Sequence, residues 1–268
     1  MLYPADEHIQ GKELRLRQQY FFISATVQRV IARFKKKHTD FNELPDKVAF
    51  QLNDTHPSMA VAELMRVLVD ENDLPWDQAW DITRRVCAYT NHTIMSEALE
   101  KWPLAFIEKA APQIVPIIHE LDLCVKDKYD DESVYIIDED DRVHMAHMDI
   151  HYGHSVNGVA YLHTEILKNN ELNAFYKIYP EKFNNKTNGI TFRRWLLHCN
   201  PRLVELLEKC IGDGFKKDAM ELKKLLAYEN DEAVLERLLE IRKKNKHQLA
   251  KYLKETQGIK LNEESIYD

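Results

Sequence analysis

Apolar residues recur at two different spacings along this chain, which predicts a mixture of helices and short strands. Over residues 14–37 they return every three or four positions, the pattern of an amphipathic helix. Residues 48–52 form a short apolar run of strand length, and residues 59–69 then resume helical spacing. The chain therefore begins with a helix, a strand and a second helix.

The order of strand, polar cluster and helix occurs twice. A helix is predicted over residues 76–85 and a second strand over residues 86–90. Asn53–His56 follow the first strand, and Asn91–Thr93 follow the second. This alternation indicates an α/β fold with at least two parallel strands, and ligands bind at the carboxyl ends of such strands. Both polar clusters are therefore candidates for a binding site.

The remaining pattern predicts more helix than strand. Further helices are expected at residues 96–102, 104–128, 156–168 and 172–176, a hairpin from residues 134–137 and 142–148, and an extended segment at residues 183–191. From residue 201 to residue 258 the chain is strongly helical and charged. The change of character near residues 193–200 predicts a boundary between a domain at 1–193 and a domain at 194–268.

Glycine is scarce. The chain has 7 glycines in 268 residues, where average usage of about 7% would give roughly 19. Neither a G-x-G-x-x-G dinucleotide fingerprint nor a P-loop can be assembled from them, so both motifs are excluded. With 30% charged and 44% hydrophobic residues, the composition favours a helix-rich globular protein over collagen-like or disordered classes.

Charge and cysteine content narrow the partners and the compartment. The net charge is −7, so no nucleic-acid partner is expected. No apolar run approaches 18 residues, so no membrane span and no membrane partner are expected. The four cysteines are widely spaced without a C-x-x-C pair, which predicts reduced thiols in a cytoplasmic protein rather than disulfides or a zinc site.

The two polar clusters allow two interpretations each. Asp54 and His56 place a carboxylate and an imidazole two residues apart, which suits general acid–base chemistry. Asn, Asp and Thr after a strand also cap the following helix, so capping remains an alternative. Asn91–Thr93 suit hydrogen bonds to sugar hydroxyls or to an amide, but they include no pair of nucleophile and base.

Four histidines close together raise the question of a metal site. They are His144, His147, His151 and His154, with Asp149 among them. His147 and His151 are four residues apart, which would suit a metal only if this stretch were helical. The apolar alternation predicts strand and turn here instead. Ordinary hydrogen-bonded histidines are therefore expected, and no metal.

Residues 184–191 are unusually rich in amide side chains. An unsatisfied buried amide costs about 1–3 kcal/mol, so these side chains either hold a loop or bind a polar ligand. Asn188 and Gly189 also fit an ordinary tight turn. Trp195, just beyond, is either a core residue or a platform for a ligand.

Several strings of the sequence resemble the glycogen (α-glucan) phosphorylase family. Residues 48–57, VAFQLNDTHP, are similar to its QLNDTHP strand and loop, and residues 88–103 resemble its AYTNHT…EALE.WP string. Residues 153–160 (GHSVNGVA) and 185–195 (NKTNGITFRRW) continue the match in the same order. The resemblance covers the whole chain. It implies part of the two-domain, glycosyltransferase-B-like architecture, helix-rich with a partial, mostly parallel sheet.

The resemblance also implies a reaction and its partners. In this family the terminal α-1,4-glucosyl unit of a glucan is transferred to phosphate, giving glucose 1-phosphate with retention. The cofactor is pyridoxal phosphate bound to a lysine, and its phosphate group relays a proton to the attacking phosphate. The partners implied for the complete enzyme are an α-1,4-glucan, phosphate and a second copy of the enzyme in a homodimer.

Site residues follow from the resemblance position by position. His92 matches the histidine that hydrogen-bonds the glucose 6-hydroxyl, Asn188 an asparagine that contacts the same sugar near the cofactor, and Trp195 a tryptophan lining the cofactor pocket. The substrate-binding residues beside the glucose are matched by Asp54, His56, Thr93, Glu97, Ala98 and Glu100, with Arg15 on the helix after a mobile loop. In that loop Glu7 replaces a sugar-contacting asparagine of the animal enzymes, and elsewhere Ser96 and Phe192 replace prolines.

The cofactor lysine and the glycine-rich phosphate-binding segments of the family are not among these strings. The chain is therefore expected to be an internal segment. Residues 1–193 would be the second half of the N-terminal domain, and residues 194–268 the helical start of the C-terminal cofactor-binding domain. No catalytic residue, bound pyridoxal phosphate or activity is expected of the segment alone. The alternatives are a non-catalytic glucan-binding or helical interaction module, and a histidine-dependent metal hydrolase.

Overall fold

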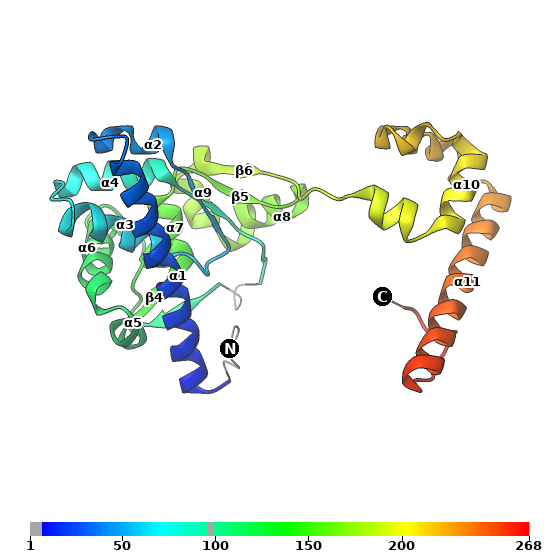
Figure 1. The fold of residues 1–268 in the computed structure, drawn as a ribbon, viewed down its shortest axis with the longest axis horizontal. Coiled ribbons are helices and arrows are strands. Elements are labelled where there is room, and N and C mark those ends of the chain that lie inside the picture. Colours follow the sequence, from blue (N-terminus) through cyan, green and yellow to red (C-terminus); the bar gives the residue numbers. More distant parts are fainter. Residues whose placement is uncertain (1–6, 96–98, 268) are drawn as a thin grey trace. The chain divides into compact units, whose positions relative to one another are not determined.

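The computed structural model describes residues 7–95 and 99–267 (Figure 1). The chain divides into two compact units, residues 1–188 and residues 189–268. Each unit is described by itself.

The first unit is built on a four-stranded parallel sheet with the strand order β1-β2-β5-β6. The strands are β1 (Phe50–Asn53), β2 (Cys87–Thr90), β5 (Val156–Gly158) and β6 (Phe183–Asn185). In register, Asn53 is opposite Thr90, Thr90 is opposite Asn157, and Gly158 is opposite Asn185. All four strands therefore end at one edge of the sheet, here named the carboxyl edge, and begin at the other, the amino edge. The α/β class and the parallel strands predicted from the sequence are confirmed.

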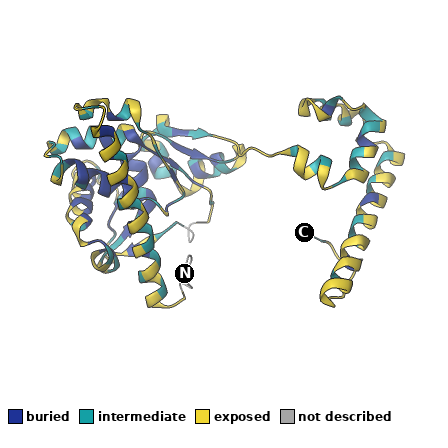
Figure 2. Ribbon diagram, viewed as in Figure 1, coloured by how far each residue is buried: buried dark blue, intermediate teal, exposed yellow. Residues whose placement is uncertain are grey.

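Helices surround the sheet and supply most of the core (Figure 2). The longer ones are α1 (Ile9–Lys35), α3 (Met59–Asp70), α4 (Trp76–Val86) and α6 (Val115–Lys126). Helix α3 is central: residues 59–65 are all buried. Its one buried acid, Glu63, accepts hydrogen bonds from Tyr20 (2.8 Å) and Ser24 (2.7 Å) of α1 and from Arg66. Burial opposes ionisation of Glu63, but the hydrogen bond from Arg66 and those from α1 outweigh it and lower its pKa.

Helix α7 (Met145–Tyr152) lies between two groups of buried apolar residues and contributes to both. One group joins α1, α3, α4 and α6, and the other joins β2, β5 and β6 with α9 (Asn173–Ile178). Because seven of the eight residues of α7 are buried, no polar face marks its helical period in the sequence. For this reason the strand predicted over residues 145–148 is wrong.

A small antiparallel pair also differs from expectation. Strand β3 (Lys101–Pro103) pairs with β4 (Arg142–His144), and Ile137 bridges to Val143. The helix predicted over residues 96–102 is thus wrong at its C-terminal end, because Trp102 is held opposite Val143; residues 96–98 lie outside the described residues. Residues 156–158 are strand β5 rather than the start of a helix, because they are inserted between β2 and β6.

Short helical segments complete the first unit. They are α2 (Leu44–Lys47), α5 (Leu104–Ala110) and α8 (Tyr161–Ile166), the π-helix η5 (Leu167–Glu171), and the 3₁₀ turns η1 (Phe41–Glu43), η3 (Pro112–Ile114), η4 (Glu132–Val134) and η6 (Pro180–Lys182). Proline begins or interrupts several of them, as the sequence predicted for the region after residue 104.

The second unit is helical, as predicted after residue 201. It contains a π-helix η7 (Arg193–His198), α10 (Pro201–Ile211), the 3₁₀ segments η8 (Gly214–Lys216) and η9 (Ala219–Tyr228), and α11 (Glu232–Gln257). The side chains of Asn200 and Asp231 cap α10 and α11, and Gly258 ends α11 in the left-handed conformation, φ 70°. Figure 2 shows how few of its residues are buried. In the described parts of both units, no helix is long and apolar enough to cross a membrane.

Candidate functional site

The carboxyl edge of the sheet gathers the polar clusters that the sequence predicted. Asn53 ends β1, Asn91–Thr93 follow β2, Asn157 lies in β5 and Asn188 follows β6. Across the strands, Thr90 Oγ1 donates to Asn157 Oδ1 at 2.8 Å. The edge thus carries a continuous row of amide, hydroxyl and imidazole groups. Such groups suit a ligand rich in hydroxyls.

The loop after β1 is held in a left-handed turn. Asp54 has φ 61°, a conformation that Asp tolerates better than most residues, and its N–H donates to Thr90 O at 2.9 Å. Helix α3 begins at Met59, and Ser58 at its N-cap makes no side-chain capping bond. Ser58 Oγ instead donates to the buried Asp149 at 2.5 Å. The side chains of residues 53–56 therefore do not cap helix α3.

His92 points towards the end of the neighbouring strand. Its Nε2 donates to Asn53 Oδ1 at 2.5 Å, and the side chain is exposed. The residue before it, Asn91, is buried; its Nδ2 donates to Tyr89 OH, and its Oδ1 accepts the Thr93 N–H, both at 2.9 Å. This turn fixes the backbone on both sides of His92 and leaves the imidazole available to a ligand.

Glu100 connects three elements beside this edge. Arg15 of α1 donates to Glu100 Oε1 at 2.8 Å, His56 Nε2 lies 3.5 Å from the same oxygen, and Trp102 Nε1 donates to Oε2 at 3.0 Å. Four of the predicted wall residues (Arg15, Asp54, His56 and Glu100) therefore come from elements that the structure brings together. Glu97 and Ala98, also predicted for the wall, lie outside the described residues.

A histidine that sequence reasoning missed ties two of the site loops together. His163, in the first turn of α8, accepts the Val159 N–H on Nδ1 at 3.0 Å and donates from Nε2 to Thr93 O at 3.1 Å. The other side of Val159 accepts the Asn188 N–H at 2.9 Å. A chain of hydrogen bonds thus runs from Asn188 through Val159 and His163 to Thr93. The only local signal in the sequence was a histidine in the first turn of a helix that follows a strand.

The amide side chains of β6 and of the loop after it have two roles. Asn184 Nδ2 donates to Ser155 Oγ at 2.8 Å, and Asn185 exchanges hydrogen bonds with Thr164 and Thr187 at 3.0 Å. These amides hold the loop. Asn188 is held through its backbone, and within the described residues its exposed side chain forms no hydrogen bond. Asn188 is therefore free to bind a ligand.

Trp195 belongs to the second unit, in η7. It is 61% exposed, so the core interpretation of this residue is wrong.

Of the histidines of the metal hypothesis, His147 and His151 lie on α7, which is helical where strand was predicted, His144 ends β4, and His154 is exposed beyond the helix. The first three are hydrogen-bonded. His144 Nε2 donates to Asp138 Oδ2 (2.9 Å), and His147 Nδ1 to Tyr135 O (2.6 Å). His151 Nε2 donates to Val134 O at 2.8 Å. Burial lowers the pKa of His147 to about 3 and that of His151 to about 4. Within residues 7–95 and 99–267, no group of three or more His, Cys, Asp or Glu side chains could hold a metal ion.

Comparison with known proteins is consistent along the whole chain. A family model described as carbohydrate phosphorylase matches residues 1–268. The maltodextrin phosphorylase of Streptococcus pneumoniae is 56% identical over 267 residues, which is 100% of this chain and 35% of that protein. The brain form of glycogen phosphorylase from Bos taurus is 45% identical, and the human muscle form 44% identical, each over 287 residues covering 100% of this chain and 34% of the relative. The chain spans about a third of the length of these relatives.

Proposed function

The chain belongs to the carbohydrate phosphorylase family, and from that premise we propose that it forms the sugar-binding side of the active site of an α-1,4-glucan phosphorylase. The reaction is phosphorolysis of terminal α-1,4-glucosyl units, giving glucose 1-phosphate with retention. The observation that carries the proposal is the meeting of the His92 and Asn188 loops at one sheet edge, where His163 and Val159 join them.

In this proposal the chain binds and orients the glucosyl unit. His92, held by its bond to Asn53, and the unpartnered side chain of Asn188 contact the sugar hydroxyls. Asp54, His56, Thr93, Glu97, Ala98 and Glu100 line the wall. Arg15, which ion-pairs with Glu100 at 2.8 Å, fixes that carboxylate beside the sugar. Uncharged donors and acceptors in fixed positions suit the selection of one hexose orientation.

Pyridoxal phosphate, which this family uses, needs a lysine for its attachment and supplies a phosphate group for proton transfer. At the carboxyl edge, Lys186 follows β6, but its side chain is exposed and donates to Asn184 Oδ1, which does not fit a lysine enclosed in a cofactor pocket. Lys182 has its pKa lowered to about 8, mainly by burial, but it precedes β6 at the opposite edge and donates to Ile150 O and His151 O. We therefore place the attachment lysine in the rest of the longer enzyme. The cofactor contacts implied for Asn188 of the first unit and for Trp195 of the second unit stay two separate proposals.

The domain assignment, the assembly and the compartment are parts of the same proposal. Residues 1–193 form the second half of an N-terminal domain, and residues 194–268 begin the C-terminal cofactor-binding domain. The division into compact units at 188/189 supports this assignment. The complete enzyme acts on an α-1,4-glucan and phosphate as a cytoplasmic homodimer. The four free cysteines, Cys87, Cys124, Cys199 and Cys210, support a reducing compartment.

The test compares the chain with a polypeptide of the relatives' length that contains it. The longer protein, loaded with pyridoxal phosphate, should release glucose 1-phosphate from maltodextrin and phosphate. The chain alone should show neither turnover nor the absorbance of a lysine imine when the cofactor is added. Turnover by the chain alone would refute the division of labour proposed here, and an inactive longer protein that binds cofactor would refute the reaction.

A second candidate is a helical interaction module, favoured by the exposed apolar residues of the second unit, among them Leu226 and Leu239. Glycogen co-sedimentation separates this candidate from the first. Specific binding of glycogen by the chain alone would favour a non-catalytic glucan-binding role.

A further inference from the structure

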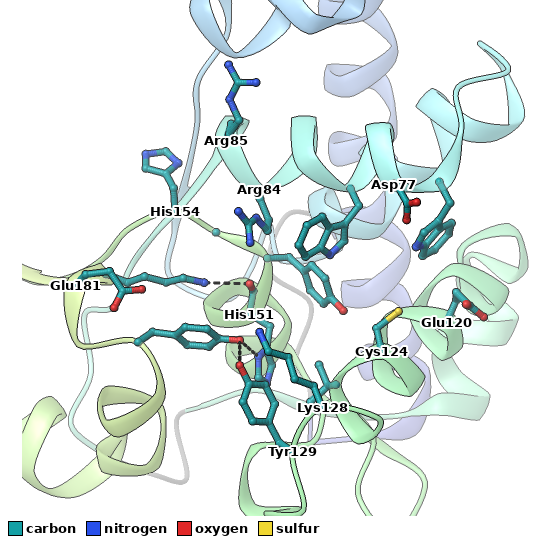
Figure 3. A pocket seen from close by; sticks show the side chains of 17 residues that line it. Asp77, Arg84, Arg85, Glu120, Cys124, Lys128, Tyr129, His151, His154 and Glu181 are labelled. Carbon is teal, nitrogen blue, oxygen red and sulfur yellow. Dashed lines mark hydrogen bonds between the residues drawn. The ribbon is translucent and has the colours of Figure 1, made fainter.

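A cavity of about 640 Å³ opens at the amino edge of the sheet, away from the site described above (Figure 3). Residues along the whole of α4, residues 151–154 before β5, and Tyr179, Glu181 and Lys182 before β6 line it, together with the end of α6 and the turn after it. Its volume lies within the roughly 300–1,000 Å³ of small-molecule sites.

Three cationic side chains of this cavity rest on three aromatic rings that also line it. The Arg84 guanidinium lies 4.3 Å from the centre of the Trp80 ring. Lys182 Nζ lies 3.9 Å from the centre of the Tyr179 ring. Lys128 Nζ lies 5.1 Å from the centre of the Tyr129 ring. The ring faces attract these cations and position them, but they leave the positive charge uncancelled.

Among the described residues, none of the three cations has a carboxylate in contact. In the described parts of the chain no Asp or Glu oxygen lies within 4 Å of Arg84, Lys128 or Lys182, although Asp77, Glu120 and Glu181 also line the cavity. The next residue on α4, Arg85, does have such a partner, since it pairs with Asp81 at 3.2 Å. The pKa of Lys182 is lowered to about 8, mainly by burial and further by the charges of Arg84 and Lys128, against which the charge of Glu181 acts. Lys182 Nζ donates to Ile150 O and His151 O, which hold it in place but carry no full negative charge. Like charges that face one cavity without a carboxylate in contact are stabilised when an anion enters.

The wall behind these cations is fixed by its own hydrogen bonds. Tyr129 OH donates to Tyr179 OH at 3.0 Å, and Tyr179 OH donates to His151 Nδ1 at 2.9 Å, while His151 Nε2 donates to Val134 O. The two tyrosine rings beneath Lys128 and Lys182 are therefore held in place before any ligand binds. A preformed site loses less entropy on binding.

We propose that this cavity binds a small molecule bearing a phosphate monoester, with its phosphate facing Arg84, Lys128 and Lys182. A phosphate group carries about −1.5 to −2 charge at neutral pH, which matches a three-cation site better than a single carboxylate does. The organic part of the ligand packs against the rings of Trp76 and Trp80. The site lies on the first unit alone and does not depend on the function proposed for the carboxyl edge.

The test uses the intact chain and three probes at constant ionic strength: phenyl phosphate, inorganic phosphate and phenol. Binding is followed by NMR through the indole N–H signals of Trp76 and Trp80. We expect phenyl phosphate to bind more tightly than inorganic phosphate, and phenol to leave both signals unmoved. Arg84→Gln should weaken phenyl phosphate binding about tenfold. The matched control Arg85→Gln removes the same charge from the same helix; Arg85 also lines the cavity but is paired with Asp81, so its loss should change the affinity less than twofold.

Two results would overturn the proposal. The first is an equal loss of affinity for phenyl phosphate in R84Q and R85Q, or indole N–H shifts with sodium chloride equal to those with phenyl phosphate. Either would mean that the anion only screens surface charge. The second is phenol binding as tightly as phenyl phosphate, which would mean that the rings alone form the site. Should R84Q unfold, the exposed Lys128→Gln replaces it in the comparison, with the same expected weakening and the same interpretation.

Discussion

The two edges of one small sheet carry opposite chemistry. At the carboxyl edge the strands end in amides, hydroxyls and histidines that hydrogen-bond one another, such as His92 with Asn53 and Thr90 with Asn157. At the amino edge the same strands begin beside cations stacked on aromatic rings, such as Arg84 on Trp80 and Lys182 on Tyr179. The first set can select a neutral, hydroxyl-rich ligand by geometry, and the second attracts an anion by charge.

The comparison also shows two ways to hold a site in place. Loops at the carboxyl edge are positioned by backbone bonds through single residues, as Asn91 and His163 show. Side chains at the amino edge are positioned by packing on rings and by the Tyr129–Tyr179–His151 chain. Substitutions should therefore affect ligand binding at the first edge and stability or anion binding at the second.

The largest effect should come from the ligand contacts at the carboxyl edge. In the complete enzyme, His92→Ala or Asn188→Ala should each reduce transition-state stabilisation by roughly 1.5–4 kcal/mol, a loss of about ten- to a thousandfold in kcat/KM. Arg85→Gln, at the other edge, is the control and should leave kcat/KM within twofold, because Arg85 pairs with Asp81. An unchanged kcat/KM in both alanine variants would show that the sugar does not bind at this edge.

The next effect is a pH dependence of stability centred on the amino edge. Burial lowers the pKa of His151 to about 4 in the folded chain, against about 6.5 when unfolded. The unfolded state then binds more protons below pH 6.5, so stability is retained above that pH and falls as the pH drops towards 4. The loss should reach about 3 kcal/mol for this residue.

Urea unfolding followed by circular dichroism at pH 7 and at pH 4 measures this loss. His147, whose pKa is about 3, should add a fall of the same sign. In His151→Gln, which cannot titrate, the difference between the two pH values should be smaller than in the unmodified chain. The same difference in both proteins would mean that His151 does not contribute to the acid sensitivity.

The sequence predicted the polar site at the carboxyl edge but not the cationic cavity at the amino edge. The carboxyl edge followed from local pattern, because each polar cluster comes directly after a strand and parallel strands end together. The amino edge was not predicted, because no local pattern distinguishes Arg84 and Lys128 from other charged residues of the chain. Their unpaired state depends on which carboxylates lie within reach, and only the tertiary structure determines that.

Helix α7 and His163 were missed for related reasons. Burial on all sides removed the amphipathic period of α7, so its apolar alternation resembled a strand. His163 bridges Val159 and Thr93, and the second of these is 70 residues away in the sequence, so no local spacing reveals the contact. Glu97 and Ala98 stay predictions, since they lie outside the described residues.

Two glycines that flank β5 give a smaller and more specific comparison of the edges. At Gly153, before the strand, an added Cβ would lie 2.7 Å from Asp149 O and 3.3 Å from Cys87 O, both backbone atoms that cannot step aside. Gly153→Ala should therefore cost about 1–3 kcal/mol of unfolding free energy. At Gly158, at the end of the strand, the Cβ would meet Thr164 Oγ1 and His163 Nδ1.

Two of the neighbours at Gly158 are side-chain atoms and the third is Thr164 Cα at 3.0 Å, so Gly158→Ala should displace His163 as well as lower the free energy of unfolding. Urea denaturation of both variants, together with the NMR shift of the Thr93 amide, checks the difference. Equal losses of stability without a shift at Thr93 would contradict the distinction between the two edges.

The smallest effect should come from His163 itself, because it acts on the sugar contacts only through the backbone. Glutamine places its amide nitrogen near the position of Nε2 and can keep the bond to Thr93 O, whereas asparagine places its oxygen near Nδ1 and can keep only the bond from Val159 N–H. Phenylalanine keeps neither. In the complete enzyme kcat/KM should fall in the order Gln, Asn, Phe, with a loss of about 1–2 kcal/mol for Phe.

Hydrogen exchange on the chain alone tests the same bridge without the reaction. His163→Phe should speed exchange of the Asn188 amide, which bonds to Val159 O, about tenfold, since one lost hydrogen bond is worth roughly 1 kcal/mol or more. His163→Gln should preserve more of that protection. If exchange at Asn188 is unchanged in the Phe variant while kcat/KM falls, His163 acts on the sugar site by a route other than Val159. If exchange speeds up while kcat/KM is unchanged, the bridge exists but the sugar contacts do not depend on it.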